Sequence, residues 1–458
     1  MENPTKDQVK LQEKKKQQNI PSKATQSKRK QIQQQIAIQG LDLENLTEEE
    51  REQKIKQHIE ALKNPCANCK QQEGQYTLRK QLVCEICYNQ KIYSKAYNHI
   101  RGAKPMEMFK KVLVAVVGEY PILDQKKSNE IIYDPLAADF TVLKTVLGKV
   151  RNGNKVLNEI EILYLDLGNE NSKLTVQKWA ELYKVNLHIK HINEAFGGSD
   201  ENLAKFLKQF KDQDEVLKIV KYNLIMETSQ KLDVDYLCLS DCGQDIAKNT
   251  FALVSQGRGI SMLQEINSVS KVQYRQKEFL VFRILKDLIN SEIYEYYKIQ
   301  MKLPENKELQ EFQKTLQNKQ EENSKNAALF DKNLKQKKPT MEDILSTFFD
   351  KLQVTFPSTV HTALRSLDKV RDKYQVEKCP CFFCLGKQDK IVNQLELDTY
   401  EELGKSKVQQ VENLCFGCMR MFKNANISIE QIMENLPPFI KENQIISMKL
   451  QEQQKEKQ

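Results

Sequence analysis

The chain has 458 residues, which is long enough for two or three domains with a substantial core. Hydrophobic residues make up 40% of it and mean hydropathy is −0.63, and no apolar run approaches the roughly 20 residues that span a bilayer. The first lysines precede no apolar segment of the kind that a secretory signal needs, so we expect a cytosolic or nuclear protein, with the cytoplasm preferred.

Residues 1–62 are rich in Gln, Lys and Glu and almost free of aromatic side chains. The first 40 residues carry nine Lys or Arg against three Asp or Glu, which is most of the net charge of +9. Such a composition cannot build a core, so we predict a polar tail, disordered at first and partly helical afterwards. Its charge is compatible with nucleic-acid contact, although a solvated tail is the simpler interpretation.

A cysteine module is predicted at residues 63–104. CANC supplies Cys66 and Cys69, and CEIC supplies Cys84 and Cys87 after 14 intervening residues. Eleven cysteines in a reducing compartment argue against disulfides, and two C-x-x-C pairs at this spacing predict a tetrahedral Cys₄ zinc site. Four protein ligands leave no position for water, so the zinc would be structural and would stabilise the module by on the order of 10 kcal/mol. An iron–sulfur cluster is the alternative.

Residues 105–300 alternate short apolar runs with longer amphipathic segments. Strands are expected at 112–117, 160–165, 185–189, 236–239 and 279–282, and helices at 135–149, 172–183, 203–230 and 244–255. This alternation predicts an α/β domain with a parallel sheet, and the continuous apolar character of the strands predicts helices on both faces.

The first of these runs ends at Gly118, where an open α/β sheet can hold a phosphate. The next residues are an acid, a bulky ring and a residue without a backbone N–H: Glu119, Tyr120 and Pro121. Outside the cysteine clusters we find no triad or carboxylate pair that would carry catalysis, so the sequence predicts no catalytic residue.

A low-complexity insertion is predicted at 301–338, and a helical segment with a second cysteine module at 339–440, before a tail at 441–458. Matching spacing selects a second Cys₄ zinc site and leaves Cys379 over; the ligands are Cys381, Cys384, Cys415 and Cys418. Cys238 is expected to be a small buried residue, whereas Cys242, at a predicted helix start, is either buried or a reactive thiolate.

The order of these motifs resembles the cytoplasmic tRNA 2-thiolation protein 2 family, over about residues 64–300 and 340–435. The resemblance rests on five stretches: CANC…TLR…CEIC…SK, VLVAVVGEYP, LSDCGQDIAKNTFALVSQGRGISM, VFRILKDLINSEIYEYY, and FFDKLQVTFPSTVHTALRSLDKV with the cysteines after it. It implies a PP-loop ATPase-like (adenine nucleotide alpha hydrolase-like) domain flanked by two zinc modules. The residues of this chain that match the family's pattern, called family-motif positions below, are Gly257, Arg258, Gly259, Arg283, Asp287 and Glu292.

The resemblance also implies that the phosphate loop is degenerate. Active relatives carry Ser-Gly-Gly-x-(Asp/Ser)-Ser after this strand, whereas here only Gly118 matches, with Val117 and Glu119 in place of the first serine and the second glycine. Losing the N–H groups and hydroxyls of that loop removes the usual ATP contacts. We therefore expect a non-catalytic subunit, with ATP bound by a partner.

The function that the resemblance implies is 2-thiolation of wobble uridine, position 34, in tRNA Lys, Glu and Gln. This chain would form a heterodimer with a catalytic adenylating sulfurtransferase that takes sulfur from a thiocarboxylated ubiquitin-like carrier, with no membrane involved. Candidate tRNA contacts are Arg79, Lys80, Lys91, Lys95 and Arg101. The alternatives are an active ATP-dependent tRNA sulfurtransferase and a zinc-based scaffold without an RNA role.

Overall fold

The computed structural model describes residues 63–102, 110–119, 122–124, 130–133, 135–150, 159–313, 341–356, 358–371, 380–386 and 414–455. The predicted tail at 1–62, most of the predicted insertion, and Cys379 lie outside these residues. The chain divides into two compact units, Met1–Lys91 and Ile92–Gln458.

The first unit contains a small antiparallel hairpin, β1 (Tyr76–Leu78) and β2 (Gln81–Val83). Arg79 and Lys80 form its two-residue turn with φ of 50° and 69°. Two successive positive φ values are typical of the type I′ turn, whose twist matches that of the paired strands. Helix α4 (Glu85–Gly102) begins directly after the hairpin and runs past the boundary of the first unit.

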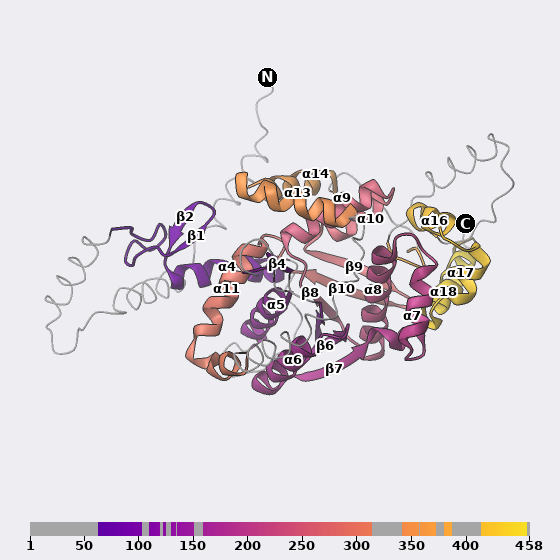
Figure 1. The fold of residues 1–458 in the computed structure, drawn as a ribbon, viewed down its shortest axis with the longest axis horizontal. Coiled ribbons are helices and arrows are strands. Elements are labelled where there is room, and N and C mark those ends of the chain that lie inside the picture. The colour runs from indigo at the N-terminus through magenta and orange to yellow at the C-terminus, as the bar shows by residue number, and fades with distance from the viewer. Residues whose placement is uncertain are drawn as a thin grey trace, which may run out of the picture. The chain divides into compact units, whose positions relative to one another are not determined.

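The second unit is built on a six-stranded sheet (Figure 1). Its order is β7 (Asn186–His191), β6 (Glu159–Asp166), β3 (Lys111–Val117), β8 (Tyr236–Leu239), β10 (Lys277–Arg283) and β9 (Val269–Tyr274). Every neighbouring pair is parallel except β9 with β10. From β3 the chain adds β6 and then β7 on one side, and it adds β8 and its neighbours on the other side. The boundary between β3 and β8 is therefore the switch point of a doubly wound fold. The predicted parallel α/β fold is confirmed, and so are all five predicted strands.

Helices cover both faces of this sheet, as the continuous burial of β3 requires. Helices α5 (Pro135–Val150) and α6 (Glu170–Tyr183) lie against one face, and α7 (Asp200–Lys208) and α8 (Gln213–Lys231) against the other (Figure 1). The helix predicted at 203–230 is thus two helices. They separate because the Asp212 side chain accepts a hydrogen bond from the Glu215 N–H and begins a new helix there.

The remaining described helices follow the sheet or lie between its last strands. They are α9 (Gly243–Ser255), α10 (Gly259–Glu265), α11 (Asn290–Lys302), α13 (Met341–Thr355), α14 (Thr359–Arg371), α16 (Phe416–Lys423), α17 (Ile429–Asn435) and α18 (Pro438–Lys455). No described helix is long and apolar enough to cross a bilayer.

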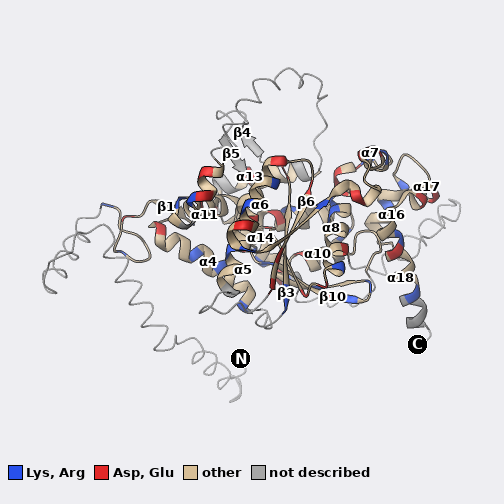
Figure 2. Ribbon diagram, turned by 90° about the horizontal axis from the view of Figure 1, so that it is seen from below, with Lys and Arg blue, Asp and Glu red and all other residues tan. Residues whose placement is uncertain are grey.

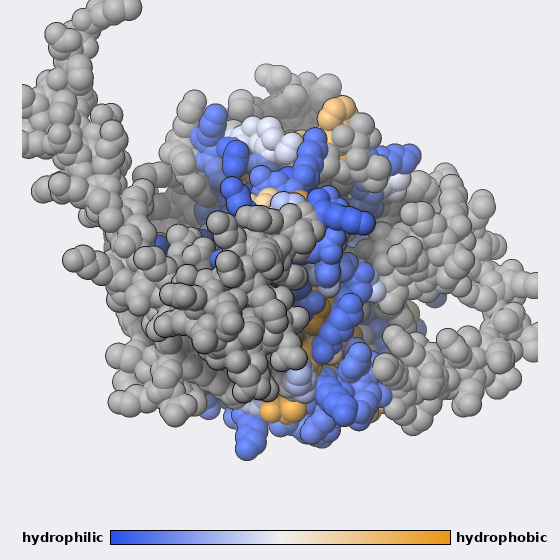
Figure 3. All heavy atoms as spheres, turned by 90° about the vertical axis from the view of Figure 1, so that its left-hand side faces the viewer, coloured by the Kyte–Doolittle hydropathy of each residue, from blue (hydrophilic) through white to orange (hydrophobic). Residues whose placement is uncertain are grey.

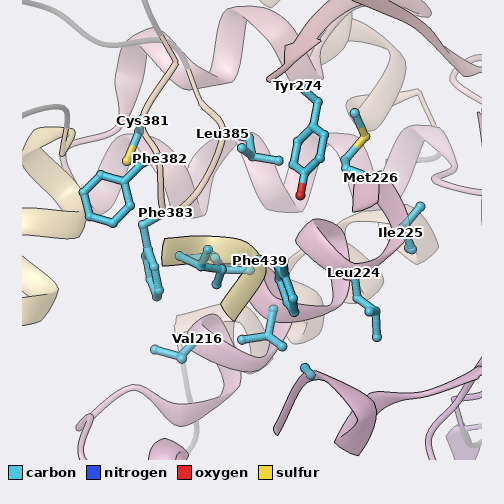
Figure 4. Close-up of a cluster of buried hydrophobic side chains, with 14 of the residues drawn as sticks. Val216, Leu224, Ile225, Met226, Tyr274, Cys381, Phe382, Phe383, Leu385 and Phe439 are labelled. Carbon is cyan, nitrogen blue, oxygen red and sulfur yellow. The ribbon is translucent and has the colours of Figure 1, made fainter. Parts of the chain in front are cut away.

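A large buried cluster joins the sheet and α8 to the C-terminal cysteine segment (Figure 4). Phe383 lies near Val216 of α8, and Phe382 and Phe439 of α18 belong to the same cluster. The second cysteine module is therefore part of the α/β core.

On the outside, basic and acidic residues are interspersed along the described helices (Figure 2), and the described residues visible in Figure 3 are mostly hydrophilic.

Candidate functional site

The first cysteine cluster is assembled within the first unit. The ligand atoms of Cys66, Cys69, Cys84 and Cys87 all lie within 4.8 Å of one another, with Cys69 Sγ and Cys84 Sγ 3.8 Å apart. The Cys84 N–H donates to Cys66 Sγ at 3.2 Å, and Asn68 Nδ2 donates to Cys87 Sγ at 3.3 Å. The hydrogen bond with Cys84 and, less strongly, that with Asn68 lower the pKa of the Cys87 thiol to about 5. The same hydrogen bond raises the pKa of the Cys84 thiol, so of these two thiols Cys87 is the one that ionises more readily.

The second cluster has the same arrangement in the second unit. Cys381, Cys384, Cys415 and Cys418 lie within 4.8 Å of one another, and Cys384 Sγ is 3.7 Å from Cys415 Sγ. The Cys415 N–H donates to Cys381 Sγ at 3.3 Å. These are the four cysteines that sequence spacing selected.

Both clusters fit one tetrahedral ion. Metal–sulfur bonds of about 2.3 Å place the four sulfurs of a tetrahedron roughly 3.8 Å apart. The distances of 3.8 Å and 3.7 Å in the two clusters match this edge. Within the described part of the chain, these two groups are the ones whose side chains could hold a metal.

Gly118 follows β3 but does not present its backbone to the solvent. Its N–H donates to the Leu165 carbonyl at 2.9 Å, and the next N–H, of Glu119, turns back to the Val117 carbonyl at 2.8 Å. A Cβ on Gly118 would lie 2.7 Å from Cζ of Tyr164. The glycine is therefore required by packing against Tyr164, and both N–H groups that a phosphate would use are already engaged.

A hairpin separates this strand from the next helix. Strands β4 (Ile122–Asp124) and β5 (Glu130–Tyr133) pair with each other, and α5 begins only at Pro135. In a phosphate-binding loop the helix N-terminus follows the strand directly and its N–H groups face the anion. Here the β4–β5 hairpin lies between β3 and α5, so the N-terminus of α5 does not follow the strand directly.

A cavity of about 500 Å³ lies at the carboxyl ends of β3, β8 and β10, at the switch point of the sheet. Seven acidic and five basic side chains line it. Four of the basic groups form ion pairs with acids of the same lining: Lys221–Glu119 at 2.5 Å, Arg258–Glu215 at 2.5 Å, Arg283–Asp241 at 3.1 Å and Lys248–Asp245 at 3.7 Å. The cavity has the position of a nucleotide site, but a triphosphate would add negative charge where acids already outnumber bases.

The family-motif positions fall in three places. Gly257, Arg258 and Gly259 form the turn into α10, and Arg283 lies in the cavity beside Asp241. Asp287 Oδ2 is 3.2 Å from His99 Nε2, and Glu292 Oε2 is 3.5 Å from Lys95 Nζ. These last two positions therefore bind α4 residues within the second unit.

The basic residues that the sequence suggested for tRNA contact also have distinct settings. Arg79 and Lys80 are exposed at the hairpin turn, and Arg101 is exposed near the end of α4. Lys91 and Lys95 are half-buried on α4, and Lys95 lies beside Glu292.

Cys238 and Cys242 are both buried. The Cys242 thiol donates to Asn290 Oδ1 at 2.9 Å, and burial raises its pKa well above the usual value. Of the two possibilities that the sequence left for Cys242, the structure supports the buried thiol. The segment HIKH, residues 188–191 of β7, contains two histidines that each face a carboxylate. His188 pairs with Glu161, and His191 pairs with Asp166, as partly exposed residues at a strand end do.

No family model matches the sequence. Three curated relatives carry the name "Cytoplasmic tRNA 2-thiolation protein 2". The protein of Aedes aegypti is 32% identical over 175 residues, which are 35% of this chain and only 34% of that protein. The protein of Schizosaccharomyces pombe is 19% identical over 78% of this chain and 92% of its own length, and that of Anopheles gambiae 22% over 70% and 74%.

Among solved structures, the chain is similar to "U34-tRNA thiolase NcsA from Methanococcus maripaludis with its [4Fe-4S] cluster", with 12% identity and a TM-score of 0.49 over 75% of this chain and 99% of that chain. The fold assignment rests on the sheet order and the two cysteine clusters themselves. Three relatives with the name of the family that the five motif stretches resemble thus match this chain, one at 32% identity over a third of its own length and two at lower identity over most of theirs.

Proposed function

We propose that this chain is a subunit of a cytoplasmic tRNA-thiolation complex. Its substrate would be wobble uridine, position 34, of tRNA Lys, Glu and Gln. The shared name of the three relatives supports the tRNA-thiolation role and the cytoplasmic location. The uridines modified and the partners follow from the family resemblance.

The end of β3 is the observation that supports a non-catalytic role for this chain beside a catalytic partner. The N–H groups of Gly118 and Glu119 donate to protein carbonyls, and Glu119 is paired with Lys221. An anionic phosphate there would meet a carboxylate and few available donors. This favours a supporting subunit whose catalytic partner binds ATP, adenylates the uridine and receives sulfur from a thiocarboxylated ubiquitin-like carrier.

We propose zinc at both cysteine clusters, with Cys66, Cys69, Cys84 and Cys87 as one ligand set and Cys381, Cys384, Cys415 and Cys418 as the other. Sulfur separations near 3.8 Å suit one tetrahedral ion. A [4Fe-4S] cluster binds one thiolate at each of its four irons, which occupy alternate corners of a cube, so the four cysteine sulfurs must lie farther apart. When bound, the ion would supply structure, because four thiolates leave no position for a substrate.

The tRNA would be held by backbone contacts to Arg79, Lys80, Lys91, Lys95 and Arg101. Contacts of this kind give affinity and salt dependence but do not select a sequence. The exposed turn of the β1–β2 hairpin and the exposed Arg101 are the most accessible members of this set.

The test is the thiolation state of bulk tRNA after depletion of this protein, read on gels in which mercury retards thiolated tRNA. We expect the retarded forms of tRNA Lys, Glu and Gln to disappear and to return with the wild-type chain. Persistence of the retarded forms would contradict the proposal and favour a zinc scaffold without an RNA role.

A further inference from the structure

The turn at Gly257–Gly259 and the second cysteine cluster interlock through three glycines. A Cβ on Gly257 would lie 2.6 Å from Cδ1 of Phe416, and Gly257 itself has φ of +78°. A Cβ on Gly417 would lie 2.6 Å from Nε of Arg258, and one on Gly386 would lie 2.9 Å from Cβ of Ser261. Each glycine thus makes room for a side chain from a segment more than 100 residues away.

Arg258 is the charged member of this interlock. It is 4% exposed, and its side chain crosses Gly417, which stands between the ligands Cys415 and Cys418. Its NH1 atom donates to Glu215 on α8 at 2.5 Å, and among the described residues its Nε has no partner within hydrogen-bonding distance. The guanidinium therefore lies between a buried carboxylate and the thiolate cluster.

The first cluster has a different surrounding. The hydrogen bonds given above for its thiolates come from a backbone N–H and from the neutral amide of Asn68. Four thiolates with one divalent ion carry a net charge of −2, and a buried net charge is costly unless an opposite charge compensates it. The second cluster is buried in the domain core and needs such compensation more.

We propose that Arg258 is the fixed counter-charge of the second metal centre, and that it slows release of the metal from this centre and not from the first. The role is one of positioning and charge, since Arg258 is not itself a ligand. The inference rests on the proposed metal at the second cluster and adds a residue that the cysteine spacing does not reveal.

The same contacts form part of the cavity at the switch point of the sheet. Arg258, directly before α10, and Ser261 of α10 line this cavity, and so do Cys384 and Gly386 of the second cysteine cluster. One wall of the cavity is therefore the interlock itself. Loading of the second centre would fix this wall, and loss of the ion would free it.

The experiment measures metal release from the full chain into an excess of a chromogenic chelator, with the two metals resolved as separate kinetic phases. Arg258→Met keeps much of the side-chain volume and removes the charge, and we expect one phase to accelerate at least tenfold, which is the usual effect of removing a group that contacts a metal ligand. Arg258→Lys should accelerate it less. The other phase should stay at the wild-type rate.

Glu215→Gln is the matched control, because it breaks the ion pair with Arg258 but leaves the guanidinium beside the thiolates. We expect wild-type release from this variant. The double variant Glu215→Gln with Arg258→Met removes both buried charges, which favours a folded chain, and it should still release one metal quickly. Circular dichroism of each variant reports folding.

The outcomes separate this inference from the metal proposal. A wild-type chain that holds fewer than two metals defeats the metal proposal for one cluster. A wild-type chain with two metals, together with folded Arg258→Met and double variants that release both at the wild-type rates, overturns the counter-charge role alone. Equal acceleration in Glu215→Gln would also overturn it, because packing or the ion pair would then suffice.

Discussion

At the scale of single residues, a glycine that matches a phosphate-loop motif can be required by packing and not by phosphate binding. Gly118 is the one residue that matches the phosphate loop of active relatives, yet its Cα faces the Tyr164 ring. Tyr164 is fully buried and its hydroxyl donates to the Asn169 carbonyl at 3.1 Å. The ring therefore has little room to move, and the sequence alone could not distinguish this role from a remnant of phosphate binding.

The first prediction concerns this contact. Gly118→Ala should lower the free energy of unfolding by about 1–3 kcal/mol, because the new methyl group overlaps Tyr164. Denaturant unfolding measures it. Gly259→Ala is the matched control: nothing lies within 4 Å of a Cβ there and the position opens a helix, so we expect no loss. Equal stability of the two variants would refute the close approach.

The second prediction concerns pH. The hydrogen bond with His99 lowers the pKa of Asp287 to about 2, from an ordinary value of 3.8. A carboxyl with a lowered folded-state pKa contributes stability that is present above the unfolded-state pKa and is lost as pH falls through the folded value. The stability of the wild type should therefore fall more between pH 4 and pH 2 than that of Asp287→Asn.

The difference should stay below about 1 kcal/mol, because the Asp287 side chain is 56% exposed and solvent screens the pair. Denaturant midpoints of both proteins at several acid pH values measure it. Parallel pH profiles would show that the His99 contact contributes nothing.

At the scale of elements, the strands were predictable and their connections were not. Five apolar runs became five parallel strands, and the inner strands β3 and β6 show the reason: burial on both faces demands continuous apolar sequence. The edge strand β9 was missed: its burial alternates, which is the weaker signal of a half-covered strand. The break between α7 and α8 was missed because apolar periodicity continues through it, and only the Asp212 cap marks it.

The candidate site follows the same division. The eight candidate cysteine ligands were selected by spacing alone, and the structure brings each set of four together. The ion pairs across the cavity and the Arg258 contact with Gly417 join segments far apart in sequence. No local sequence pattern indicates such pairs, so they could not be predicted from one sequence.

The third prediction follows from the end of β3. The isolated chain should show no saturable binding of Mg-ATP at millimolar concentration, because the Gly118 and Glu119 N–H groups are engaged and the cavity lining is net acidic. Isothermal titration calorimetry tests this, with adenosine as the uncharged control. Stoichiometric heat of binding for Mg-ATP would revive the interpretation as an active enzyme.

The fourth prediction concerns the second cysteine module. Cys381→Ser should reduce bound metal by one equivalent and destabilise the α/β domain, because Cys381 and its neighbours Phe382 and Phe383 belong to the core cluster. Amide hydrogen exchange in β3 and β8 is the measurement. Cys379→Ser is the control, since spacing leaves this cysteine outside the ligand set. Equal effects of both substitutions would contradict the ligand assignment.

At the scale of the whole molecule, the fifth prediction addresses RNA. Replacing Lys91 and Lys95 by Ala together should weaken tRNA binding and flatten its dependence on salt, because binding with fewer phosphate contacts releases fewer counterions from the tRNA. Binding measured at several salt concentrations gives both quantities. Lys271→Ala, an exposed lysine on β9, is the control. Unchanged affinity and slope in the double variant would remove α4 from the tRNA contact surface.

The buried cluster that joins the sheet to the C-terminal segment has a consequence for biosynthesis. Its members run from Leu113 in β3 to Ile440 in α18, and the Asn223 side chain of α8 donates to the Phe383 carbonyl at 2.7 Å. A nascent chain that has left the ribosome only as far as Pro380 would therefore present the apolar side of α8 without its cover. Until the C-terminal cysteine segment is synthesised and packs on α8, this apolar surface is open to aggregation.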